Sequence, residues 1–151
     1  MKSKTLGLTV LCLAVAALPL HGASAAARKS DKIATLSLQD LIHHPDYAVH
    51  VPSDIKFYFA DQPVTVKQML GPVRTSRKTT LKTDPFASCR WAMYSALIAI
   101  AEEARVQGGN AVVNIRSNFG DVETASQQSY KCGIGMRMVG VALKGDVAVV
   151  E

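Results

Sequence analysis

Two cysteines, Cys89 and Cys132, are the residues best suited to specific chemistry in the chain beyond residue 25. In a protein exported to an oxidising compartment, an even number of cysteines predicts a disulfide. The alternative is a redox or metal-binding thiol pair, but no Cys-x-x-Cys motif is present and two thiols alone make a poor metal site. We therefore predict a Cys89–Cys132 disulfide, which would stabilise the fold by about 4 kcal/mol through loop closure.

Three histidines, His43, His44 and His50, share one segment with Asp46. Imidazole and carboxylate groups are common metal ligands. Adjacent residues such as His43 and His44 point in different directions on any regular element, so only a loop could fold them onto one ion. A weak metal site at these three histidines is an alternative function, and we expect no cofactor.

The most basic window of the chain runs from Arg74 to Lys82. Its cations alternate with the hydroxyl groups of serine and threonine, a composition that suits an anion site. A solvated edge strand guarded by charge would have the same composition. The candidate anion-binding residues are Arg74, Arg77, Lys78 and Lys82.

Motifs of enzymes are missing from the sequence. It contains no Gly-x-Ser-x-Gly elbow and no His-Glu-x-x-His motif, and no spacing pairs a serine with a histidine and an aspartate. A disulfide-bonded cysteine cannot act as a nucleophile. We therefore expect a protein that is not an enzyme.

The N-terminal 25 residues have the pattern of a secretory signal peptide. Lys2 and Lys4 precede an apolar stretch from residue 6 to 20, and Ala23-Ser24-Ala25 supplies a cleavage site. The apolar stretch is shorter than the roughly 20 residues that a membrane-spanning helix needs. We expect residues 1–25 to be removed, leaving no stable membrane span and a periplasmic or secreted protein.

The remaining residues suffice for one small domain. Residues 26–34 are small and charged without apolar periodicity and are predicted to be a flexible leader, and residues 35–151 a single α+β domain. Of 17 lysines and arginines, two lie in the signal peptide, which leaves fifteen against 12 acidic residues. This mild positive charge favours an anionic envelope component, such as lipid head groups or polyanionic glycans, over nucleic acid.

One helix is strongly indicated from Pro85 to about Val106. Asp84 suits the N-cap, Pro85 suits the first helical position, and Gly108-Gly109 provides the stop. Apolar residues recur at spacings of three and four along it, so one face should pack on a sheet. The other face is broadly apolar too, so the helix is either deeply buried or shared with a second copy of the chain.

Strand patterns lie on both sides of this helix. Alternation predicts a strand over residues 55–60, an extended segment over 64–80 with a kink at Gly71-Pro72, and a compact strand over 110–116. Residues 36–42 fit a helical turn or a strand, and residues 117–129 a loop or hairpin end. One long strand is expected over 130–143, ended by residues 144–146, with 147–150 as a short edge strand. The predicted fold class is α+β, with an antiparallel or mixed sheet of about four strands, one long helix and one disulfide.

The helix is followed by Gly108-Gly109-Asn110-Ala111-Val112-Val113-Asn114-Ile115-Arg116, and a glycine-rich strand closes with residues 139–145. This pattern resembles the YbjQ-like heavy-metal-binding domain family over roughly residues 64–145, in particular small exported proteins labelled "excinuclease ATPase subunit". A more distant resemblance is to the outer-membrane stress-sensor lipoprotein of the Rcs phosphorelay. The resemblance implies a disulfide-stapled helix-on-sheet domain.

The labels attached to these families imply activities that the residues do not support. No Gly-x-x-x-x-Gly-Lys-Ser/Thr loop is present for an ATPase. The resemblance covers none of the three histidines, so it transfers no metal ligand. We expect a non-enzymatic envelope protein, a small binding or homo-oligomerising domain with a role in the envelope stress response, and a weak metal- or anion-binding protein is the alternative.

Overall fold

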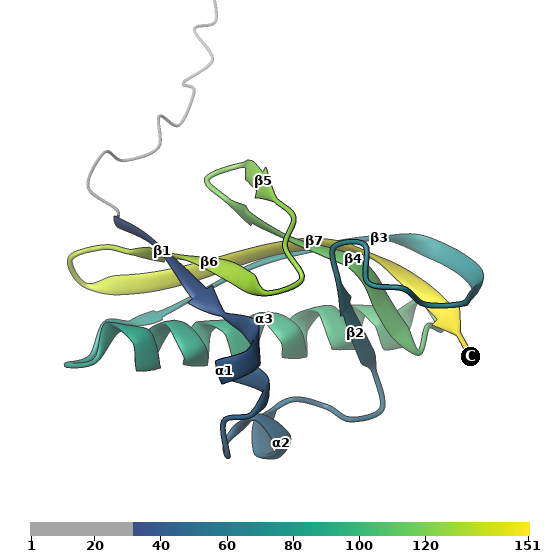
Figure 1. Cartoon of the computed structure of the whole chain (residues 1–151), viewed down its shortest axis with the longest axis horizontal. Helices are drawn as coiled ribbons and strands as arrows, with labels where there is room; N and C mark the ends of the chain where they lie inside the picture. Colours follow the sequence, from purple (N-terminus) through teal and green to yellow (C-terminus); the bar gives the residue numbers. More distant parts are fainter. Residues whose placement is uncertain (1–31) are drawn as a thin grey trace, which may run out of the picture.

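The fold is a single curved sheet with one helix packed along one of its faces (Figure 1). A computed structural model describes residues 32–151. The predicted signal peptide, residues 1–25, and leader residues 26–31 lie outside the described part. The elements in chain order are β1 (Lys32–Ser37), α1 (Leu38–Ile42), α2 (Tyr47–His50), β2 (Lys56–Phe59), β3 (Val66–Thr80), α3 (Pro85–Val106), β4 (Ala111–Phe119), β5 (Val122–Thr124), β6 (Ser129–Ile134) and β7 (Met138–Val150).

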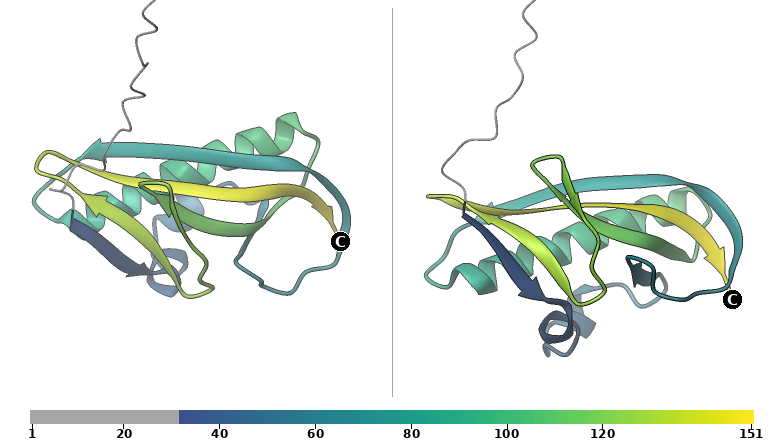
Figure 2. Two further views of the ribbon diagram at one scale, coloured as in Figure 1. Left: turned by 90° about the horizontal axis from the view of Figure 1, so that it is seen from above. Right: turned by 45° about the horizontal axis from the view of Figure 1, so that its top comes forward.

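Strand β7 is the centre of the sheet. It pairs with β3 along its whole length, with β6 near its start and with β4 near its end, all antiparallel. Strand β1 extends the sheet beyond β6, β5 pairs with the end of β4, and β2 runs parallel to β4. Within the described residues β3 has no partner other than β7, so it is an edge strand (Figure 2).

Helix α3 has the predicted bounds because its end signals are local. The Asp84 carboxylate accepts a hydrogen bond from the backbone of Phe86, and Pro85 follows at the first position. Gly108, with a φ of 81°, takes the left-handed conformation that ends a helix at low cost. The helix has 22 residues, about 33 Å. Strand β3 has 15 residues and is about 50 Å long, because an extended chain rises more per residue than a helix. The helix is therefore not especially long for the sheet it covers.

The core lies between α3 and the sheet. Alternate residues of β7, from Val139 to Val147, point toward the helix, and their side chains are at most 1% exposed. From α3 the core takes mostly small and branched side chains, among them Leu97 and Ile100. Burial of this apolar surface is the main source of stability for such a layer. No helix within residues 32–151 has the length and apolar character needed to cross a membrane.

The predicted α+β class, the mostly antiparallel sheet and the disulfide are confirmed, but the number of strands is wrong. The sheet has seven strands where about four were predicted. Residues 32–34, placed in the flexible leader, instead begin β1 and pair with residues 132–134. The polar stretch 117–129 contains the end of β4 and all of β5.

The single strand expected over residues 130–143 is two strands. They form the β6–β7 hairpin, in which the backbone N–H of Gly135 donates to the carbonyl of Met138. Residues 144–146 do not end a strand, and 147–150 are not an edge, because β7 continues to Val150 between β3 and β4. The apolar alternation is the same on both sides of a tight turn, so it cannot show where the chain reverses.

Candidate functional site

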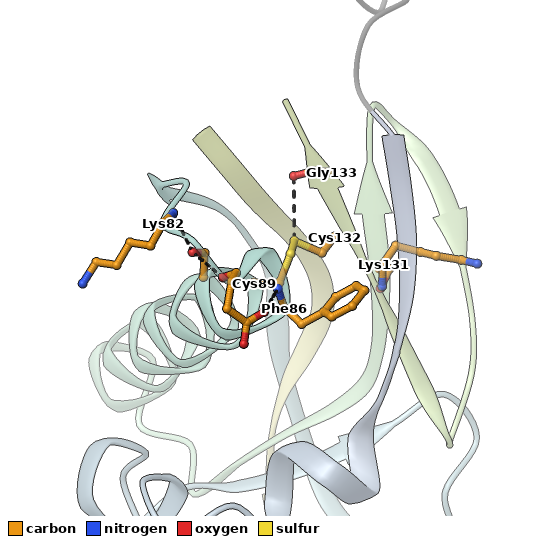
Figure 3. The surroundings of a disulfide bond; sticks show 9 residues. Lys82, Phe86, Cys89, Lys131, Cys132 and Gly133 are labelled. Carbon is orange, nitrogen blue, oxygen red and sulfur yellow. Dashed lines mark hydrogen bonds between the residues drawn. A yellow bond between two sulfur atoms is a disulfide. The ribbon is translucent and has the colours of Figure 1, made fainter. Parts of the chain in front are cut away.

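The Cys89–Cys132 disulfide connects α3 to β6 (Figure 3). The Cα atoms are 6.0 Å apart and both residues are 0% exposed. In Figure 3 Lys131, the neighbour of Cys132, points away from the helix toward the other face of the sheet. The disulfide is therefore a buried structural bond, and it offers no thiolate for catalysis or metal binding.

The three histidines predicted as metal ligands make separate contacts. His43 bonds through Nδ1 to the carbonyl of Gln39, and the Nδ1 of His44 lies 3.5 Å from a carboxylate oxygen of Asp46. The ring of His50 packs against that of Trp91, with centroids 4.6 Å apart. Within residues 32–151, no three His, Cys, Asp or Glu side chains are grouped to hold a metal. The predicted metal site is therefore not assembled.

Aromatic side chains surround His50 beneath the helix. Tyr94 is 1% exposed, and its hydroxyl has no hydrogen-bond partner within the described residues. Burial raises the pKa values of Tyr47 and Tyr94, and raises that of Tyr130 well above the ordinary value. Tyr94 and Tyr130 are buried in the core, and Tyr47 packs against it.

The four cations predicted as one anion site lie on two sides of the sheet. Strand β3 alternates regularly from Val73 to Thr80, so Arg74 and Lys78 face one way and Arg77 faces the other. Arg77 lies with buried Val73 on the side of α3. Lys82 follows the end of β3, where its backbone N–H donates to the hydroxyl of Ser88. The predicted group therefore divides. Arg74 and Lys78 border one groove, whereas Arg74 and Arg77 share a smaller hollow that Glu103 also lines.

Arg74 and Lys78 border a groove of about 560 Å³ on the sheet face opposite α3. Ser76 lies between them on β3, and Ala142 forms part of the floor. The far wall is the β4–β5 hairpin, which rises from the sheet on the side away from the helix (Figure 1). This volume is within the range of small-molecule binding sites.

The ring of Phe119 packs against two glycines in the floor of the groove, Gly133 and Gly140. A Cβ atom at Gly133 would lie 1.8 Å from the ring's Cζ, and one at Gly140 would lie 3.7 Å from its Cε2. Any side chain at position 133 would occupy the space of the ring. Residues Ile33, Gly133, Gly140 and Lys78 form one row across four strands, so Ile33 and Lys78 flank the glycines.

A second row on this face contains only cations. Arg74, Lys144 and Arg116 lie directly opposite one another on β3, β7 and β4. Like charges in such positions destabilise a sheet. Glu123 on β5 offsets two of them, because its carboxylate oxygens lie 2.7 Å from Lys144 Nζ and 3.2 Å from Arg116 Nη1.

Arg74, the third cation of this row, forms no salt bridge with Glu123. The hydrogen bond from Lys144 and, to a smaller extent, the charge of Arg116 lower the pKa of Glu123. Within residues 32–151 neither Arg74 nor Lys78 forms a salt bridge. Within that range Arg77 and Lys82 form none either, but they do not line the groove, so Arg74 and Lys78 are the cations available there to an anionic ligand.

Asn118, next to Phe119, contributes a polar group to the groove. Its side chain is 6% exposed, and its Oδ1 has no hydrogen-bond partner within the described chain. Asn114, four residues earlier, is already engaged, because its amide donates to the carboxylate of Asp146. The groove residues of the β4–β5 hairpin were missed from the sequence because they belong to the polar stretch after residue 116, which gave no strand signal.

The comparisons with known proteins are sparse. No protein-family model matches the chain, and no curated protein matches it in sequence. Among solved structures, it is similar to a protein of unknown function from Pediococcus pentosaceus, described as belonging to the DUF74 family. The two share 13% sequence identity with a TM-score of 0.46, over 64% of this chain and 98% of that chain. A similarity at this level supports no conclusion about function.

Proposed function

We propose that this protein is an exported, non-enzymatic binding domain that holds an anionic component of the cell envelope on the open face of its sheet. The observation that carries the proposal is the groove bordered by Arg74 and Lys78, two cations without a salt bridge in the described chain. Lys144, directly opposite Arg74, is paired with Glu123 and adds little to this charge. Asp121 on the hairpin also lines the groove, so two cations of β3 face one carboxylate there. A cleft in which one sign of charge predominates concentrates ligands of the opposite sign.

Export rests on the N-terminal pattern and is supported by chemistry elsewhere in the chain. The buried Cys89–Cys132 disulfide is compatible with an oxidising compartment. Membership in the YbjQ-like family and a role in the envelope stress response stay predictions. A homo-oligomer also stays a prediction, which light scattering of the purified protein would test.

A polyanion titration tests the binding proposal. The oxidised protein is titrated with fluorescent dextran sulfate and with neutral dextran of the same length, and binding is followed by anisotropy at low salt. Because two charged contacts are removed, Arg74→Ala/Lys78→Ala should weaken binding of dextran sulfate by about tenfold or more. Neutral dextran should not bind.

A matched control comes from the same basic window. Arg77→Ala/Lys82→Ala removes the same charge, but from the helix side of β3 and from beyond its end. This variant should bind dextran sulfate nearly as well as the unmodified protein. Equal weakening by the two double variants would mean that net charge, and not the groove, attracts the anion, and the proposal would fail.

A further inference from the structure

Phe119 gives the groove a fixed aromatic surface. The Cζ end of its ring packs on Gly133, and its Cε2 atom lies near Gly140, which the aliphatic part of the Lys78 side chain also contacts. A ring held in this way loses little conformational entropy when a ligand packs on it. Its electron-rich face attracts the partly positive C–H groups of a flat, saturated ring, which is the surface that a sugar presents.

Asn118 offers a hydrogen-bond acceptor that a simple anion, which has no donor, cannot satisfy. Asn118 lines the groove, and its buried Oδ1 has no hydrogen-bond donor within the described residues. A buried acceptor without a donor costs free energy, so a ligand that supplies an O–H or N–H group is favoured. Sulfate groups and carboxylates offer acceptors only, whereas the hydroxyls of a sugar can donate.

The cations lie on the opposite wall and are spaced along the groove. Arg74 and Lys78 are four residues apart on β3, which places their Cα atoms about 13 Å apart. This separation is larger than one sugar ring. The site therefore suits a chain of sugar units that carries repeated negative charges.

We infer that the groove between β3 and the β4–β5 hairpin binds an acidic saccharide. Its acidic groups meet Arg74 and Lys78, a ring packs on Phe119, and a hydroxyl donates to Asn118. The inference rests on the proposed anion-binding function and names the class of ligand. An anionic lipid surface is less well suited, because it presents repeated charges but no flat, saturated ring that could pack on Phe119.

The test compares acidic saccharides with a polyanion that is not a sugar. The oxidised protein is titrated by calorimetry with hexagalacturonate, with a sulfated dextran hexamer and with hexaglutamate blocked at both ends, which carries the same number of carboxylates as the first. Vesicles containing phosphatidylglycerol are titrated in the same way. At least one acidic saccharide should bind about tenfold or more tightly than hexaglutamate. Neutral maltohexaose should bind weakly or not at all.

Two variants test the named contacts. Asn118→Ala removes the acceptor, and Phe119→Leu keeps apolar bulk while removing the aromatic face. Each should weaken saccharide binding by about five- to tenfold and leave binding of hexaglutamate unchanged. Val106→Ala, at an 82% exposed position at the end of α3 and outside the groove, is the matched control and should bind as the unmodified protein does. Urea denaturation of each variant verifies that it is folded at the titration temperature.

The outcomes separate the inference from the proposed function. If hexaglutamate binds as tightly as both saccharides, or if only vesicles containing phosphatidylglycerol bind, the saccharide inference is overturned while anion binding by the groove stands. If no polyanion binds, the proposed function fails and the inference fails with it. Unchanged saccharide affinity in both Asn118→Ala and Phe119→Leu would also overturn the inference.

Discussion

The two faces of the sheet differ sharply, although the same strands build both. On β7, Val141 and Leu143 point toward α3 and are almost completely buried. The residues that alternate with them, such as Ala142 and Lys144, form the opposite face, where the groove lies. Because side chains alternate along a strand, one segment can supply the core and the binding surface independently.

This difference separates stability from binding. The helix-covered face has the disulfide and most of the buried apolar surface. The open face has cations, a carboxylate that pairs with two of them, and glycines that admit an aromatic ring. Changes on the covered face should therefore reduce stability most, and changes on the open face should affect binding more than folding.

Removal of the disulfide should have the largest effect. The bond joins residues separated by 43 positions, so its loss should lower the free energy of unfolding by about 4 kcal/mol in the chain-entropy model. The variant is Cys89→Ala/Cys132→Ala, which avoids leaving one free buried thiol, and the measurement is urea denaturation. A loss below about 1 kcal/mol would show that the covered face does not depend on this bond.

A matched pair of truncations compares the faces directly. Leu97 on α3 is 0% exposed, whereas Val122 on the open-face hairpin is 68% exposed. Leu97→Ala should cost about 3 kcal/mol of unfolding free energy because it leaves a cavity. Val122→Ala should change it by less than about 0.5 kcal/mol. Equal losses in thermal or urea denaturation would contradict the separation of roles.

The glycine floor of the open face is tested by a double-mutant cycle. Gly133→Ala places a Cβ where the Phe119 ring lies, so it should cost about 1–3 kcal/mol through overpacking. In a Phe119→Ala background the same substitution should cost much less, which gives a coupling energy of about 1 kcal/mol or more. If the two losses of unfolding free energy were additive in urea denaturation, a glycine at position 133 would not be needed to make room for the Phe119 ring.

The sequence predicts those features that depend on local signals. The bounds of α3 follow from Asp84, Pro85 and the Gly108-Gly109 pair, and the disulfide follows from the cysteine count in a chain with an export signal. The number of strands depends on pairing between distant segments. Residues 32–34 join the sheet only because β6 provides an edge for them, and nothing in their own composition predicts it.

The groove shows a different limit. Arg74 and Arg77 lie in one basic window, but they are three positions apart, and residues at an odd offset in a strand face opposite ways. The sequence already contained this signal, since residues 64–80 were expected to be extended. Phe119 could not be placed from sequence, because only the register of β6 and β7 sets glycines beneath its ring.

The smallest predicted effect concerns charge on the open face. Lys144 and, less strongly, Arg116 lower the pKa of Glu123, so its stabilising contribution is present above the ordinary glutamate pKa and is lost as the pH falls through the lowered value. Glu123→Gln should therefore lower the urea midpoint slightly at pH 7 and low salt, and the difference should vanish in acid. In 1 M salt it should shrink as well, because exposed charges are screened.

The control for Glu123→Gln is Glu102→Gln, which removes the same charge from an exposed position on α3. Glu102 has no salt bridge within the described residues, so its replacement should not produce the same dependence on pH and salt. If the deficit of Glu123→Gln persisted at pH 3, shape and not charge would explain the role of Glu123. The row formed by Arg74, Lys144 and Arg116 would then need no carboxylate, and the open face would tolerate its like charges through solvation alone.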